Sequence, residues 1–430
     1  MRWHAWGVDP TSIRLPADLL PADGRFGCGP SKVRPQQLDA LVAAGSGVLG
    51  TSHRKPPVKR LVGSVRAGLT ELFGLPDGWE IVLGNGGTTV FWDVATFGLV
   101  DQRSQHLVFG EFSAKFAEAC AAAPHLGEPT IRSTDPGDHP EALAMADIDL
   151  YALTHNETST GVAMDLRRPE GTADGSLVAV DATSAAGGLP WDPSEVDVYY
   201  FAPQKCFASD GGLWLAACAP AAVERIERIA TSDRWRQASL DLGIALTNSR
   251  QDQTYNTPAV ATLVLLDAQV QWMNEHGGLD WCVERSRTSA ATLYGWAEAR
   301  DWATPFVTDP AKRSAVVGTI DLDDSISADA VCAAQLVQAR QQSHRRHALA
   351  VDGSAPALAL AEAGAQASGV ADRFTTRQGD AFDVLEALGA EGARFDLVVC
   401  DPPAFAPTKP ALDAGLRAYE RVARLAAPLV

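Results

Sequence analysis

The sequence predicts an α/β fold in which a mainly parallel sheet is covered by helices. From about residue 41 to residue 273, short apolar runs of strand length alternate with segments of helical pattern, and each run ends in Gly, Asn, Asp or Thr. Strands that alternate with helices in this way are typical of parallel sheets buried on both faces. With 430 residues, 46% of them hydrophobic and 21% charged, the chain can form about two or three domains.

The apolar runs place five strands in the first part of the chain. They span residues 80–83, 106–109, 150–153, 177–180 and 196–201. Long helices are expected over residues 257–300, followed by a strand over 316–322 and a helix from near Ser327. Ligands of such sheets bind at the carboxyl ends of the strands, so chemistry is expected there.

A change of composition near residue 336 predicts a domain boundary. The stretch that ends at Arg346 is polar and basic, without Gly or Pro. Beyond it a strand is expected over 348–351, a helix from Ala355 to about Ser368, and a strand over 395–400. The predicted division is an N-terminal segment 1–40, a large domain 41–300, a truncated small domain 301–335, a junction 336–346 and a C-terminal segment 347–430.

Charge and cysteine content exclude several classes of protein. The formal charge of −17 opposes attraction to nucleic acid or anionic lipid, so no nucleic-acid partner is expected. The seven cysteines are scattered without a Cys-x-x-Cys pair, which favours a reducing cytoplasm over a disulfide framework or a zinc site, and no metal is expected. The N-terminus lacks a signal-peptide pattern, and no apolar run reaches the roughly 18 residues of a membrane span.

A glycine-rich turn joins the first predicted strand to a helix-like segment. Gly84-Asn85-Gly86-Gly87-Thr88-Thr89 offers bare backbone N–H groups and two hydroxyls at a helix N-terminus, where the helix dipole also favours an anion. The turn is neither a Walker loop nor a G-x-G-x-x-G fingerprint. Taken alone, it is consistent both with a phosphate cradle and with a purely structural turn.

A carboxylate and an amine follow two other predicted strands. Asp181 ends the strand over 177–180, and Lys205 follows the strand over 196–201, so neighbouring strand ends can present both groups to one crevice. Each residue has a simpler reading, as a helix-capping aspartate or a solvated lysine. Together with the glycine turn they indicate pyridoxal-phosphate chemistry, which needs an amine for a Schiff base, an acid at the pyridine nitrogen and a phosphate cup.

Eight segments, in order along the chain, carry a resemblance to a known family. They are residues 24–32, 51–54, 84–89, 110–113, 155–161, 181–184, 202–205 and 255–258. On these segments, residues 14–332 resemble the phosphoserine aminotransferase family, whose members are fold-type I pyridoxal-phosphate enzymes. The resemblance implies a cytoplasmic homodimer of serine biosynthesis. Its reaction converts O-phospho-L-serine and 2-oxoglutarate into 3-phosphohydroxypyruvate and L-glutamate.

The resemblance also implies a role for each matching residue. Lys205 forms the Schiff base with pyridoxal 5′-phosphate and moves a proton between the substrate α-carbon and the cofactor. Asp181 holds the pyridine nitrogen protonated, so that the ring can accept an electron pair. The other implied cofactor contacts are Phe112 on the ring face, Thr158 at the 3′ oxygen, Gly87, Thr88 and Gln204 at the phosphate, and Asn256 and Thr257 from a second subunit.

His53 and Arg54 are the residues that the resemblance assigns to the substrate phosphate. A guanidinium beside an imidazole suits a dianion, although a surface loop of mixed charge is the simpler reading of this segment alone. The sequence departs from the family at Cys206, where Asn usually follows the lysine. It also lacks, beyond residue 332, the strands that supply an arginine for the substrate α-carboxylate. Cofactor binding with weak turnover is therefore expected, and a cofactor-binding protein without turnover is the alternative.

The C-terminal segment carries a second resemblance. Residues 348–354, 379–382 and 395–405 resemble part of the S-adenosylmethionine-dependent ribosomal RNA cytosine-5 methyltransferases. The resemblance implies that Asp352 contacts ribose, that Asp380 contacts adenine and that Asp401-Pro402-Pro403 borders the methyl-transfer site. Strand-end and helix-capping aspartates are the simpler readings. Because a glycine-rich loop and several strands of that fold are missing, we interpret the segment as a partial, methyltransferase-like fragment.

Overall fold

The structure is a computed structural model that describes residues 28–45, 47–329, 331–332, 348–367, 371, 374–395, 398, 400 and 412–429. The chain separates into two compact units. One extends from Phe26 to Ala328, and the other includes the chain from Asp329 onward. The predicted junction 336–346 lies outside the described residues.

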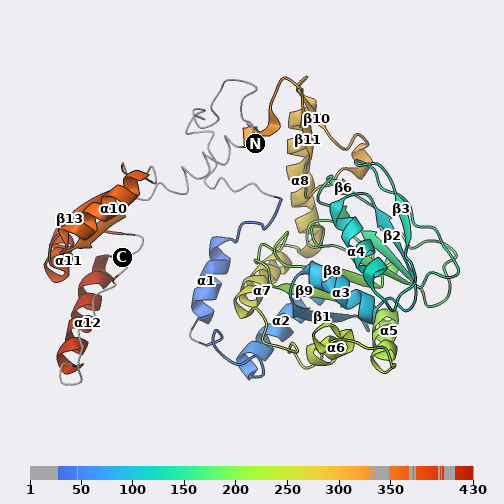
Figure 1. Ribbon diagram of the computed structural model, residues 1–430, viewed down its shortest axis with the longest axis horizontal. Coiled ribbons are helices and arrows are strands. Elements are labelled where there is room, and N and C mark those ends of the chain that lie inside the picture. The colour runs from blue at the N-terminus through green and yellow to red at the C-terminus, as the bar shows by residue number, and fades with distance from the viewer. Residues whose placement is uncertain are drawn as a thin grey trace. The chain divides into compact units, whose positions relative to one another are not determined.

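A seven-stranded sheet forms the centre of the first unit (Figure 1). Its order is β1-β9-β8-β7-β4-β2-β3. Every neighbouring pair from β8 to β3 is parallel, whereas β9 is antiparallel to both β1 and β8. The predicted mainly parallel sheet is thus confirmed. The strands are β1 (Glu80–Asn85), β2 (Ser104–Val108), β3 (Thr130–Ser133), β4 (Leu150–Thr154), β7 (Leu177–Asp181), β8 (Val198–Phe201) and β9 (Leu213–Cys218).

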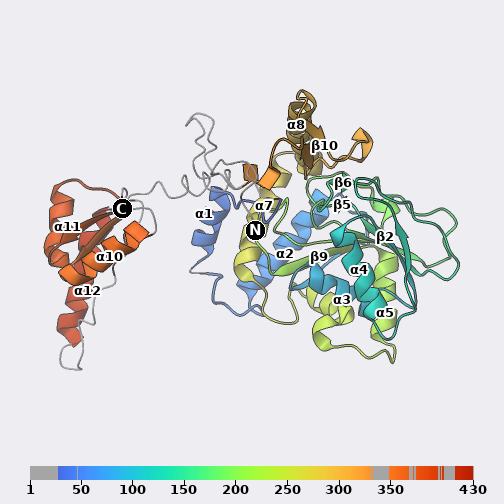
Figure 2. The ribbon, with the colours of Figure 1, turned by 45° about the horizontal axis from the view of Figure 1, so that its top comes forward.

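Helices cover both faces of this sheet (Figures 1 and 2). Alternate side chains of one strand enter different cores: Val178 and Val180 pack into one, and Ala179 into the other. The first core includes α2 (Pro56–Leu72) and α7 (Val260–Glu275). The second includes α3 (Thr88–Gly98), α4 (Glu111–Ala122), α5 (Pro220–Ala230) and α6 (Leu242–Ser249). Cys282 of α8 (Gly278–Glu298) belongs to the first core, and α1 (Pro35–Ala44) contacts α7.

A smaller layer follows α8. Here β10 (Ala303–Pro305) pairs antiparallel with β11 (Ile320–Leu322). The strand predicted over 316–322 is wrong at its start, because the backbone N–H groups of Val316 and Val317 donate to the Ser314 hydroxyl at 3.1 and 2.9 Å and form a turn. A short hairpin of β5 (Asn156–Glu157) and β6 (Val162–Ala163) lies within the large domain.

The second unit contains a parallel βαβ element. Strand β12 (Ala348–Asp352) pairs with β13 (Phe374–Gln378), and α10 (Ala355–Ala367) connects them. The strand β13 was not predicted, and the strand expected over 395–400 lies largely outside the described residues. Two further helices are α11 (Ala381–Ala390) and α12 (Leu412–Ala426). Among the described residues of both units, no helix is long and apolar enough to cross a membrane.

Candidate active site

Asp181 lies at the carboxyl end of β7 and is almost completely buried. The backbone N–H of Thr183 donates to its Oδ1 at 2.9 Å, and the indole Nε1–H of Trp92 donates to its Oδ2 at 3.1 Å. Burial raises the pKa of this carboxyl, the bonds from Thr183 and Trp92 oppose the rise, and the charge of Glu157 adds to it. The site thus contains a buried carboxylate held by hydrogen bonds from Thr183 and Trp92.

The glycine-rich turn meets the same segment. Gly87 is the N-cap of α3, and Thr88 is its first helical residue. The hydroxyls of Thr88 and Thr183 share a hydrogen bond of 2.7 Å. A Cβ added to Gly87 would meet no atom within 4 Å, so the space beyond this turn is open. The first N–H groups of a helix have no partner within the helix, which makes this turn a suitable site for an anion.

Lys205 follows β8, the neighbour of β7. Its Nζ donates to the carbonyl oxygen of Cys28 at 3.2 Å, and a Cβ on Gly29 would lie only 2.4 Å from Nζ. Next to it, the Cys206 thiol donates to the carbonyl oxygen of Ser184 at 3.4 Å. Burial raises the pKa of this thiol to about 12, so Cys206 is a neutral packing residue. The structure therefore joins the lysine loop to the turn that follows Asp181.

Thr158 and Phe112 are positioned by a residue to which we gave no role from the sequence. Glu157 is fully buried, and its carboxylate accepts hydrogen bonds from the backbone N–H of Ser113 at 2.8 Å, that of Phe112 at 3.4 Å and the Ser159 hydroxyl at 2.7 Å. It thereby caps α4, which begins beside Phe112. The hydroxyl of Thr158 donates to the Ser184 hydroxyl at 2.9 Å. In the sequence, the only signal for this role was the position of an acidic residue within segment 155–161.

His53 and the 256–257 loop lie together within one protomer. The Thr257 hydroxyl and His53 Nδ1 are 3.2 Å apart and share a hydrogen bond, and Asn85 Nδ2 donates to the Thr257 carbonyl oxygen at 3.0 Å. Burial lowers the pKa of His53, and the neighbouring Arg54 lowers it further. Arg54 itself is exposed. The contribution of Asn256 and Thr257 to a second subunit stays a prediction.

Several buried polar atoms around this site have no hydrogen-bond partner among the described residues. They are Gln204 Oε1, Asn156 Oδ1 and His53 Nε2. Buried polar atoms are nearly always paired in folded proteins, so unpaired ones around an open turn point to a polar ligand. In the described part of the chain, no group of three or more His, Cys, Asp or Glu side chains could hold a metal ion.

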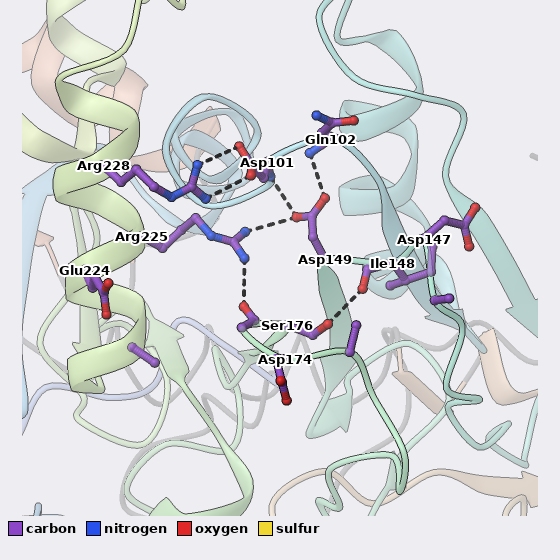
Figure 3. A pocket seen from close by; sticks show the side chains of 14 residues that line it. Asp101, Gln102, Asp147, Ile148, Asp149, Asp174, Ser176, Glu224, Arg225 and Arg228 are labelled. Carbon is purple, nitrogen blue, oxygen red and sulfur yellow. Dashed lines mark hydrogen bonds and ion pairs between the residues drawn. The ribbon is translucent and has the colours of Figure 1, made fainter.

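A hollow of about 470 Å³ lies at the opposite, amino ends of the strands (Figure 3). Arg225 donates to Asp149 at 3.1 Å and to the carbonyl oxygens of Leu99 and Gly175, and Arg228 donates to Asp101 at 2.8 Å. Asp149 also accepts three backbone N–H bonds from residues 101–103. Because these charges satisfy one another, this end of the sheet is structural.

The class-V aminotransferase model matches residues 42–338, which include every residue of the candidate site. The chain belongs to the class-V aminotransferase family. Among relatives of this aminotransferase, the phosphoserine aminotransferase of Rhodococcus opacus is 60% identical over 314 residues, which are 73% of this chain and 84% of the relative. That of Corynebacterium glutamicum is 59% identical over 325 residues, 76% of this chain and 86% of the relative.

Solved structures agree on the fold of this class-V aminotransferase. A phosphoserine aminotransferase from Cytophaga hutchinsonii matches with a TM-score of 0.65 and 21% identity, over 76% of this chain and all of that one. One from Bacillus circulans matches with a TM-score of 0.61 and 18% identity, over 70% and 83% of the two chains. At this identity the likeness concerns the fold alone.

Two acidic residues of the C-terminal segment have local partners. Asp352 accepts the backbone N–H of Ser354 at 2.7 Å, and Asp380 accepts that of Phe382 at 2.9 Å as the N-cap of α11. The simpler readings therefore account for both carboxylates: Asp352 ends β12, and Asp380 caps α11. Asp401, Pro402 and Pro403 lie outside the described residues.

Proposed function

We propose that the protein is a pyridoxal-phosphate-dependent phosphoserine aminotransferase of serine biosynthesis. It moves the amino group of O-phospho-L-serine to 2-oxoglutarate and yields 3-phosphohydroxypyruvate and L-glutamate. The observation that carries this proposal is the meeting of Asp181, the Lys205 loop and the open N-terminus of α3 in a chain that is 60% identical to a phosphoserine aminotransferase. The bound cofactor supplies an aldehyde that takes up amino groups and a ring that accepts an electron pair.

The three parts of the site fit the three parts of this cofactor. The amine of Lys205 would hold the cofactor at its aldehyde carbon and, when the substrate amine takes its place there, would be free to carry the proton from the substrate α-carbon. Asp181 would pair with the pyridine nitrogen and stabilise its proton in a buried environment. The α3 N-terminus, with Gly87 and Thr88, binds the phosphate, and the unpaired amide oxygen of Gln204 indicates that this side chain has its partner there too.

Phe112 and Thr158 orient the cofactor ring. Phe112 lies near the start of α4 with 37% of its surface exposed, so its ring is accessible to a ligand. Thr158 is joined through Ser184 to the turn after Asp181. We assign the ring face to Phe112 and the 3′ oxygen to Thr158, with Glu157 fixing the start of α4 between them.

The substrate phosphate is assigned to His53 and Arg54. His53 contacts the 256–257 loop, whose residues Asn256 and Thr257 we assign to the cofactor phosphate of a second copy. The active form is therefore a homodimer. Separately, the seven free cysteines support a cytoplasmic location, because disulfides are rare there. The domain division stays as predicted from the sequence, with a truncated small domain. Turnover is weak if no arginine meets the substrate α-carboxylate.

The test is cofactor binding followed by turnover. Purified protein mixed with pyridoxal phosphate is expected to show the visible absorbance band of a lysine-bound cofactor. Lys205→Ala should lose the band, whereas Lys312→Ala, at a lysine paired with Asp138 on the surface, should keep it. Phosphoserine-dependent formation of glutamate above a no-enzyme blank then separates an aminotransferase from a cofactor-binding protein. Absence of both the band and glutamate would refute the proposal.

Methyl transfer to RNA by the C-terminal segment is the alternative function. The parallel element of β12, α10 and β13 is the one observation that favours a methyltransferase-like fragment. Because Asp352 and Asp380 each accept a backbone N–H from a residue two positions on, we expect a calorimetric titration with S-adenosylmethionine to give no heat of binding. A measurable heat that is lost in Asp352→Ala would support the alternative.

A further inference from the structure

Trp92 lies one helical turn beyond Thr88 on α3, so both side chains face the same side of the helix. Both reach the turn that follows β7. Thr88 bonds the Thr183 hydroxyl at 2.7 Å, and the Trp92 indole N–H bonds Asp181 Oδ2 at 3.1 Å. The helix that presents the anion-binding N-terminus is therefore attached at two points to the segment that carries the buried acid.

This attachment fixes a distance that matters for a rigid ligand. In the proposed function, one end of the cofactor is its phosphate, at the N-terminus of α3, and the other is its pyridine nitrogen, at Asp181. A rotation of α3 or a turn of the Asp181 carboxylate would change the spacing between these two contacts. Because the two bonds lie one turn apart on one helix, they oppose both movements.

The Trp92 bond also affects the carboxylate itself. Asp181 is buried, and burial favours its neutral form. Its Oδ1 accepts the backbone N–H of Thr183 and its Oδ2 accepts the indole N–H of Trp92, and the Thr183 side chain also bonds the carboxylate. Donors to an anion stabilise the anion, so the loss of the indole N–H removes one of the hydrogen bonds that favour the ionised form of Asp181.

We propose that Trp92 is a positioning residue for the cofactor, which orients Asp181 toward the pyridine nitrogen and sets its distance from the phosphate-binding end of α3. The proposal rests on the proposed function. Trp92 does not contact the reacting atoms, and its effect passes through Asp181. Trp92 also packs in the second core, but a phenyl ring could fill most of that space. The feature that only the indole supplies is the N–H bonded to Asp181.

The test compares two cofactors on Trp92→Phe. We expect its dissociation constant for pyridoxal 5′-phosphate, measured by equilibrium dialysis, to rise about tenfold, the effect of one hydrogen bond to a charged group. With 1-deazapyridoxal 5′-phosphate, which lacks the ring nitrogen, the parent protein and the variant should bind equally well, because the contact that Trp92 supports is missing in both. The KM for phosphoserine should stay unchanged while kcat falls.

Trp191→Phe is the matched control. Trp191 belongs to the other face of the sheet, and its buried Nε1 has no hydrogen-bond partner among the described residues, so this variant loses an indole without losing such a bond. It should bind both cofactors as the parent does. If Trp92→Phe does not fold, Trp92→Met, whose flexible side chain adapts to an apolar core, supplies the same comparison.

Three outcomes are informative. A loss of affinity confined to the cofactor with a ring nitrogen supports the inference. An equal loss with both cofactors, or none with either, overturns it and leaves the proposed function intact. A parent protein that binds neither cofactor refutes the proposed function and this inference with it.

Discussion

The carboxylate of Glu157 offers the sharpest test of how the site is held together. In Glu157→Gln one oxygen becomes an NH₂ group. The remaining oxygen can still accept from Ser159 and Phe112, but the NH₂ then faces the backbone N–H of Ser113, which now donates to Glu157 at 2.8 Å. A buried donor left without an acceptor costs about 1 to 3 kcal/mol, and the surviving bonds lose their charge assistance.

Part of this loss is offset, because the amide is cheaper to bury than the anion. We therefore expect Glu157→Gln to lower the free energy of unfolding by about 2 to 3 kcal/mol, or the melting temperature by about 5 °C. Thermal unfolding followed by circular dichroism measures the shift. The start of α4 should loosen as well, so that the visible band of the bound cofactor forms at higher cofactor concentration.

Glu111→Gln is the matched control for this experiment. Glu111 lies on the same helix, but its side chain is exposed and pairs only with Lys115 at 2.7 Å. An exposed pair of this spacing contributes about 0.3 to 0.5 kcal/mol, so the melting temperature should hardly change. Equal melting of Glu157→Gln and Glu111→Gln would show that the cap on α4 is not stabilising and would refute the reasoning.

Three further predictions concern other parts of the first unit. Burial lowers the pKa of both His106 and His155 to about 3, so the unfolded chain binds two more protons below its own histidine pKa. The free energy of unfolding should therefore have its full value above about pH 6.5 and decrease below it, by about 1.4 kcal/mol for each histidine per unit that the pH is lowered. Denaturant unfolding that is unchanged from pH 7 to pH 5 would contradict this. Gly29→Ala, with φ at +135° and a Cβ 2.4 Å from Nζ of Lys205, should weaken cofactor binding measured by dialysis, and unchanged binding would exclude the tight fit. Asp149→Asn should lower the free energy of unfolding in denaturant by about 2 to 4 kcal/mol but leave cofactor affinity unchanged, and a loss of affinity would link the two ends of the sheet.

The strands that the sequence predicts correctly are those with continuous apolar runs. The residues of β4 and β7 are all buried, and such runs stand out against their polar flanks. By contrast, β3 alternates between half-buried and exposed residues at the sheet edge, and its four residues include Arg132. The buried run of β9 is as apolar as β4, but it follows the glycine turn after Lys205 and was not counted as a strand.

The candidate site could be predicted where the type of a residue indicates the chemistry that it can perform. An aspartate and a lysine at strand ends, with a glycine turn, indicated one edge of the sheet, and the structure brings the three segments together there. Trp92 and Glu157 could not be recognised in the same way, because each acts on another site residue. An apolar helix such as α3 places a tryptophan in the core for packing alone, and only the coordinates show its N–H directed at Asp181.

The ion network around Asp149 makes the two ends of the sheet different in their response to substitution. At the amino ends of the strands, Arg225 pairs with Asp149 and Arg228 with Asp101, so a substitution in either pair should lower stability. At the carboxyl ends of the strands, buried atoms such as Gln204 Oε1 have no hydrogen-bond partner among the described residues. A bound cofactor can supply these missing hydrogen bonds. Binding of pyridoxal phosphate should therefore raise the melting temperature, because it adds hydrogen bonds at the carboxyl ends of the strands. The stability of the folded enzyme then depends on the concentration of this cofactor.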